Sequence, residues 1–144
     1  MAERANGIIL DTNVVVAHLR GSVDLQTLAS PDEPLFLALI ALGELYRGVL
    51  KSARPESNRA KVDEFLEIAA VLYPDVATAE IYAQIAQALD TQGTPIPEKD
   101  LWIAAVALEC DMPLATRDDH LTSRNARYPL VVKEAFKSRG SQVA

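Results

Sequence analysis

Four acidic positions of this sequence are distinguished by where they fall among its apolar segments. Asp11 directly follows the short apolar segment 8–10, and Asp118, with Asp119 beside it, follows the segment "PLAT". Glu44 and Asp100 fall in segments whose apolar residues recur at helical spacing. In an open parallel sheet, ligands bind beyond the carboxyl ends of the strands, and neighbouring helices can project side chains above the same edge. These positions therefore predict a shared site.

Carboxylates gathered in this way restrict the chemistry of the site. Two of them about 4–5 Å apart repel each other by about 3–4 kcal/mol at an effective dielectric near 20. Such a cluster must bind protons, a basic side chain or a divalent cation. Sets of oxygen ligands favour Mg²⁺ or Mn²⁺, and a divalent ion held by carboxylates is typical of phosphodiester hydrolysis.

Each acid also has a purely structural interpretation, which the sequence leaves open. Asp11 could cap a strand end, and Asp118 could cap the short helix that follows it. Asp100 falls in a first helical turn, where the helix dipole favours any acid. Glu44 could be an exposed helix residue. The structural interpretation is weaker for the four acids together, because all of them fall at sheet-edge positions.

Other chemistries lack essential parts. His18 and His120 are the only histidines and no cysteine pattern accompanies them, which disfavours a zinc site. The single cysteine, Cys110, lies between Glu109 and Asp111, an acidic setting that raises a thiol pKa and disfavours a nucleophile. The sequence contains no G-x-S-x-G, P-loop or dinucleotide-binding glycine motif.

Composition sets further limits. The 144 residues have the length of one domain, with 137–144 expected to be a frayed tail. The net charge of −6 disfavours non-specific nucleic-acid binding, but two segments are basic, 47–61 and 117–139. They suit either a polyanion substrate or a solvated helix face. We find no apolar run of membrane-spanning length and no secretory pattern at the N-terminus, so a cytoplasmic location is expected.

The apolar patterns predict an α/β fold, with short strands at 8–10, 35–38 and 112–116, a short strand in "VLY", and a last strand in "YPLVV". Helices are expected at 14–19, from Ile40 to near Pro55, in "ATAEIYAQIAQALD", and from Pro97 to about Glu109. The segment "NRAKVDEFLEIAAVL" places Val62, Phe65, Leu66, Ala69 and Leu72 on one helical face. Strands separated by helices indicate a three-layer α/β/α sandwich with a mostly parallel central sheet.

Four segments together resemble PIN-domain proteins, most closely the VapC-type toxins of bacterial toxin–antitoxin pairs. They are "ILDTNVVVAHL", "LALIALGELYRGV", "IPEKDLWIAAVAL" and "PLATRDDHL", in the order and approximate spacing of that family. The resemblance extends from Ile8 to about Val132. It implies an endoribonuclease that depends on Mg²⁺ or Mn²⁺, acts on RNA, pairs with a small VapB-like antitoxin protein and forms a homodimer.

Carried over by position, the catalytic and metal-binding acids of the family fall on Asp11, Glu44, Asp100 and Asp118. The supporting polar residues fall on Thr12, Asn13 and Thr116, with Asp119 competing with Asp118 for the fourth acid. Two departures concern the second and third acids. Lys99 stands beside Asp100, where a small or polar residue is expected, and it could contact phosphate or point to solvent. The helix of Glu44 lacks the serine or threonine that often precedes it.

Substrate contacts are expected from the basic segments, with Arg47, Lys51 and Arg117 as the leading candidates. The competing readings are a non-catalytic PIN-like binding module, a metal-dependent DNA nuclease and a phosphate-receiving signalling domain. The last requires adjacent acids before its first helix, which "ILDTN" does not supply.

Overall fold

A parallel sheet forms the centre of the computed structural model, which describes residues 6–117 and 132–134. Within these residues the sheet has five strands in the order β3-β2-β1-β4-β5, and every neighbouring pair is parallel. The strands are β1 (Ile8–Leu10), β2 (Leu35–Ala38), β3 (Ala69–Leu72), β4 (Leu114–Thr116) and β5 (Val132–Glu134). Predictions that concern Asp118, Asp119 and the tail 137–144 lie outside the described residues.

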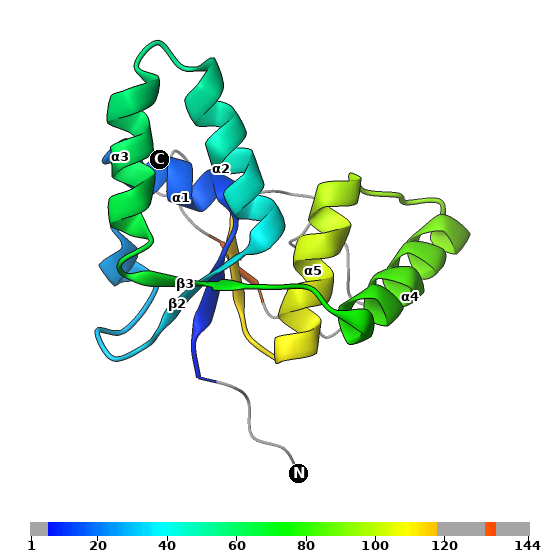
Figure 1. Cartoon of the computed structure of the whole chain (residues 1–144). Coiled ribbons are helices and arrows are strands. Elements are labelled where there is room, and N and C mark those ends of the chain that lie inside the picture. The colour runs from blue at the N-terminus through cyan, green and yellow to red at the C-terminus, as the bar shows by residue number, and fades with distance from the viewer. Residues whose placement is uncertain (1–5, 118–131, 135–144) are drawn as a thin grey trace, which may run out of the picture.

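Helices cover the sheet from two sides (Figure 1). They are α1 (Thr12–Leu19), α2 (Leu39–Lys51), α3 (Pro55–Phe65), α4 (Val76–Gln92) and α5 (Glu98–Cys110), with a short 3₁₀ helix at Leu25–Thr27. Helices α1, α2 and α3 gather on one side, and α4 and α5 on the other. The predicted α/β/α arrangement is therefore confirmed. None of the helices in the described ranges has the length and apolar character needed to span a bilayer.

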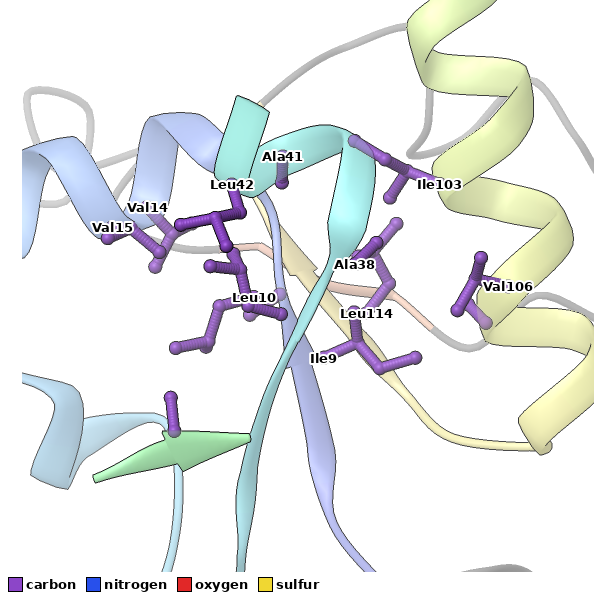
Figure 2. Packing of buried hydrophobic residues seen from close by; sticks show 14 of the residues in the cluster. Ile9, Leu10, Val14, Val15, Ala38, Ala41, Leu42, Ile103, Val106 and Leu114 are labelled. Carbon is purple, nitrogen blue, oxygen red and sulfur yellow. The ribbon is translucent and has the colours of Figure 1, made fainter. Parts of the chain in front are cut away.

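The central strand β1 has helices on both of its faces, and its three residues are fully buried. Successive strand residues point to opposite faces of a sheet. Leu10 accordingly lies beside Leu42 of α2, whereas Ile9 lies with Leu114 toward Val106 of α5 (Figure 2). Since Ile9 pairs with Leu114 in register, the same apolar contacts fix β1 against β4. The core thus holds the strand end that carries Asp11.

One predicted element is wrong. Ala69 and Leu72 were expected on the helical face of Val62, but α3 ends at Phe65 and both residues belong to β3. β3 pairs in parallel with β2, from Leu35 opposite Ala69 to Ala38 opposite Leu72. The predicted strand "VLY" therefore begins earlier, because edge pairing with β2 outweighs the helical spacing of these apolar residues.

The described part of the last strand begins at the last residue of its predicted segment. It was expected in "YPLVV", but the described strand β5 is Val132–Glu134, paired with β4. Residues 128–131 lie outside the described ranges. The register pairs Leu114 with Val132 and Thr116 with Glu134, so β5 ends level with β4.

A buried hydroxyl ties helix α4 to helix α5. Asp75 caps α4 by accepting from the backbone N–H of Thr78, and the Thr78 hydroxyl accepts from the Asp75 N–H in return, which completes a capping box. The Thr78 side chain is fully buried and also hydrogen-bonds to Glu109 near the end of α5. Because α5 begins at Glu98, this contact helps to fix the helix that carries Lys99 and Asp100.

We predict that Thr78→Val lowers the free energy of unfolding by about 1–3 kcal/mol, because valine keeps the volume but loses the hydrogen bonds that the Thr78 hydroxyl makes with Asp75 and Glu109. Urea denaturation of the two proteins measures the difference. Thr91→Val is the matched control, since Thr91 is exposed on the same helix, and a change within about 0.5 kcal/mol is expected. Equal losses in both variants would contradict the role given to Thr78.

Candidate functional site

The carboxylate of Asp11 lies at the junction of β1, α1 and β4. Its Oδ1 accepts from the backbone N–H of Thr12 at 2.7 Å, which caps α1. Its Oδ2 accepts from the Thr116 hydroxyl at 2.6 Å, across the ends of β1 and β4. Both Asp11 and Thr116 are fully buried. The cap expected at the end of this strand is therefore the N-cap of helix α1, and the Asp11 carboxylate is fixed through both of its oxygens.

Thr12 connects the first acid to the second. Its hydroxyl donates to Oε1 of Glu44 at 2.8 Å, from α1 to α2. The Glu44 side chain is 38% exposed, so the reading as a freely exposed helix residue is wrong. Helix α2 starts directly after β2, at Leu39, and its N-cap residue Ala38 makes no side-chain cap. That agrees with the missing serine or threonine, and it brings Glu44 above the carboxyl edge of the sheet.

Lys99 lies between the second and third acids. Its Nζ is 3.3 Å from Oε1 of Glu44 and 3.5 Å from Oδ1 of Asp100. Lys99 therefore does not simply point to solvent, and its expected contact with phosphate stays a prediction. Burial lowers the pKa of Lys99, but the carboxylates of Asp11, Asp100 and Glu44 raise it by more, so its net pKa lies above the ordinary lysine value.

Asp100 is the most enclosed acid of α5. Its side chain is only 1% exposed, and it stands in the first turn of the helix, as predicted. The helix dipole favours a carboxylate there. Burial at this depth, however, exceeds what dipole stabilisation of a surface acid requires, because an ionised carboxylate loses its hydration. A cation nearby explains its position better than the dipole alone.

The structure thus brings three of the four predicted acids into one network. Contacts run from Thr116 through Asp11, Thr12, Glu44 and Lys99 to Asp100. Asp118 and Asp119 lie outside the described residues, so the fourth acid stays a prediction.

Asn13 and Arg117 meet at one end of this network. The Asn13 Oδ1 accepts from the backbone N–H of Arg117 at 3.1 Å, which fixes the chain as it leaves β4. The Arg117 residue itself is exposed, and so are Arg47 and Lys51 on α2. Their predicted contact with substrate stays a prediction.

The carboxylates of Asp11, Glu44 and Asp100 are ligands of the kind that a hard divalent cation prefers. All of their acidic atoms are carboxylate oxygens, the ligands that Mg²⁺ and Mn²⁺ favour. The Lys99 ammonium already occupies the space between two of them as a stand-in cation. Within residues 6–117 and 132–134, no three acidic, histidine or cysteine side chains yet converge on one ion position.

Sequence reasoning missed the role of Lys99. The signal was present as the dipeptide Lys99-Asp100 in a predicted first helical turn. Adjacent helix residues point in different directions, so that spacing does not suggest an ion pair. The contact between Lys99 and Glu44 arises because Glu44 approaches from another helix, α2.

Cys110 is disfavoured as a nucleophile, as expected. Burial is the main cause of the raised pKa of its thiol, and the charges of Glu109 and Asp75 raise that pKa further. The sequence indicated Glu109, but it indicated neither burial nor Asp75.

Comparison with known proteins identifies the family. Residues 8–126 match the PIN domain. The chain belongs to the PIN domain family. Ribonuclease VapC1 of Haemophilus influenzae (strain R2866) is 29% identical over 114 residues, which cover 76% of this chain and 85% of that protein. Toxin FitB of Neisseria gonorrhoeae is 32% identical over 121 residues, which cover 77% of this chain and 87% of that protein.

The fold of this PIN domain also matches solved structures. A structure of VapBC2 from Rickettsia felis, bound to a DNA fragment from its promoter, aligns with a TM-score of 0.77 at 26% identity. The alignment covers 88% of this chain and 96% of that chain. The resemblance to VapC-type toxins is therefore confirmed at the level of family and fold.

For this PIN domain we predict that Thr116→Val lowers the free energy of unfolding by about 1.5–3 kcal/mol in chelator, because a hydrogen bond to a buried carboxylate is lost. Chemical denaturation is the measurement. Thr116→Ser keeps the hydroxyl and removes only a methyl group, so we expect it to retain most of the stability. A valine variant as stable as the parent would show that Thr116 does not support Asp11.

Proposed function

We propose that this chain is an endoribonuclease that depends on Mg²⁺ or Mn²⁺ and acts as the toxin of a toxin–antitoxin pair. The observation that carries the proposal is the network of buried and half-buried carboxylates at the carboxyl edge of the sheet. Similarity to proteins named as VapC ribonucleases supports RNA as the substrate.

Asp11, Glu44 and Asp100 would hold the cation, with Asp118 or Asp119 as a fourth acid. When bound, such an ion lowers the pKa of water and offsets negative charge on the phosphate. Thr116 and the backbone N–H of Thr12 orient the Asp11 carboxylate, and the Thr12 hydroxyl orients Glu44. Because these donors belong to strand and helix ends, the acids are held in place before substrate arrives.

Substrate phosphates would meet the basic side chains around the acids. Arg47 and Lys51 follow Glu44 by three and seven residues on α2, so all three share one helical face. A groove of about 230 Å³ begins at Glu44 and runs between α1, α2 and α3, with Arg20 and Lys61 in its lining. Arg117 leaves the end of β4 beside Asn13. These cations could neutralise an RNA backbone in spite of the acidic net charge.

The antitoxin would be a VapB-like protein, and the chain would form a homodimer. Structures of relatives from Rickettsia felis and Neisseria gonorrhoeae are complexes of two components, VapBC2 and FitAcB. We expect the antitoxin to bring an arginine or another cation to the acids, because a guanidinium pairs bidentately with carboxylate.

We predict that Asp100→Asn abolishes RNA cleavage measured with total RNA in Mg²⁺ or Mn²⁺, because a charged oxygen ligand is lost. Asp90→Asn is the matched control, since Asp90 is an exposed aspartate on helix α4, and its cleavage should equal that of the parent. Mapping of the RNA ends measures cleavage by the two variants.

Chelator and substrate arms complete the test. The parent should lose cleavage in excess chelator and regain it when the metal is restored. Full cleavage in chelator would contradict the metal dependence. Cleavage of single-stranded DNA in place of RNA would favour a DNA nuclease, and the absence of any cleavage would favour a non-catalytic binding module.

A further inference from the structure

We propose that Lys99 is a built-in cation of this site, which holds the acids together without metal and must be displaced when a divalent ion binds. The inference rests on the proposed function, because it assigns the acids to a metal site. It adds a residue of this chain that regulates the metal affinity of that site.

The first argument is geometric. Nζ of Lys99 lies 3.3 Å from Oε1 of Glu44 and 3.5 Å from Oδ1 of Asp100, between two acids from different helices. Oxygen ligands surround Mg²⁺ at about 2.1 Å. An ion that bridges the same two oxygens would occupy the space that the ammonium fills. The two cations are therefore mutually exclusive at that position.

The second argument concerns charge. Asp11 and Asp100 are almost completely buried, and Glu44 is little more than one-third exposed. Carboxylates gathered at one site repel one another where hydration is limited. The Lys99 ammonium offsets one negative charge and contacts two of the acids directly. Removal of this ammonium would take away the cation that Glu44 and Asp100 share.

The third argument concerns the route by which Lys99 leaves. Its side chain is 30% exposed, in contrast to the 1% of Asp100 beside it. A lysine stem is long and flexible, so the ammonium can move to water without a change in the backbone of α5. A divalent ion can therefore take its position while Asp100 stays in place.

The affinity test compares Mn²⁺ binding by titration calorimetry in the full-length parent, Lys99→Met, Lys99→Arg and Arg54→Met, all without RNA. Methionine keeps the stem and removes the charge, so we expect Lys99→Met to bind Mn²⁺ at least about tenfold more tightly, since a positive charge a few Å away is lost. Lys99→Arg keeps the charge and should bind less tightly than Lys99→Met. Arg54→Met, which removes an exposed cation between α2 and α3, should match the parent.

The second readout is thermal unfolding in chelator, which a merely solvated lysine would not affect. Lys99→Met should lower the Tm, and added Mn²⁺ should raise it by more than in the parent, because metal then supplies the missing charge. If Lys99→Met does not fold without metal, the double variant Lys99→Met/Asp100→Asn should recover folding, since one repelling carboxylate is neutralised.

The outcomes separate this inference from the proposed function. Unchanged Mn²⁺ affinity together with an unchanged Tm in chelator for Lys99→Met would overturn the role of Lys99, whatever the protein does to RNA. Tighter Mn²⁺ binding and a lower Tm would support the role of Lys99 even if the protein cleaved no RNA. The absence of cleavage would then count against the proposed nuclease activity and not against the role of Lys99. Weaker Mn²⁺ binding in Lys99→Met would also overturn the inference, since it would make Lys99 a support of the metal.

Discussion

Mutual repulsion among carboxylates is the constraint on which the arrangement of this site depends. Parallel strands deliver their following residues to one edge of the sheet, and here that edge receives Asp11 from β1 and Thr116 at the end of β4. Glu44 and Asp100 approach from helices α2 and α5. Each acid faces a hydrogen-bond donor or a cation within the described residues: backbone and hydroxyl groups for Asp11, a hydroxyl and Lys99 for Glu44, and Lys99 for Asp100.

The fold makes this arrangement rigid by burying what lies beneath it. β1 is central in the sheet and its three residues are fully buried, so the backbone that leads to Asp11 cannot shift without disturbing both helix layers. On the opposite side, the Thr78 hydroxyl couples the start of α4 to Glu109 near the end of α5. The position of Asp100 therefore depends on contacts at the far end of its helix as well as on its neighbours.

Much of this organisation could be predicted from the sequence, for physical reasons that differ between elements. The segments 8–10 and 35–38 became strands within the predicted bounds, because short apolar runs that end at an acid or begin after proline have few alternatives. Ala69 and Leu72 were misassigned, because their spacing suits a helix as well as an edge strand. Pairing with β2 makes this segment a strand. The ion pair of Lys99 with Glu44 could not be predicted, since it joins α5 to α2 and no local pattern encodes the relative placement of these helices.

The capping and metal-binding interpretations of Asp11 are not alternatives. As the cap of α1, the carboxylate accepts from the Thr12 N–H at 2.7 Å, and Thr116 fixes its second oxygen at 2.6 Å. These bonds fix the orientation of the carboxylate, which is the condition for a preorganised ligand. A residue that caps a helix at the edge of a parallel sheet is therefore held rigidly at the edge that Glu44 and Asp100 also approach. What distinguishes a structural aspartate from a ligand at this position is whether further carboxylates face it, and here Glu44 is one hydroxyl away, through Thr12.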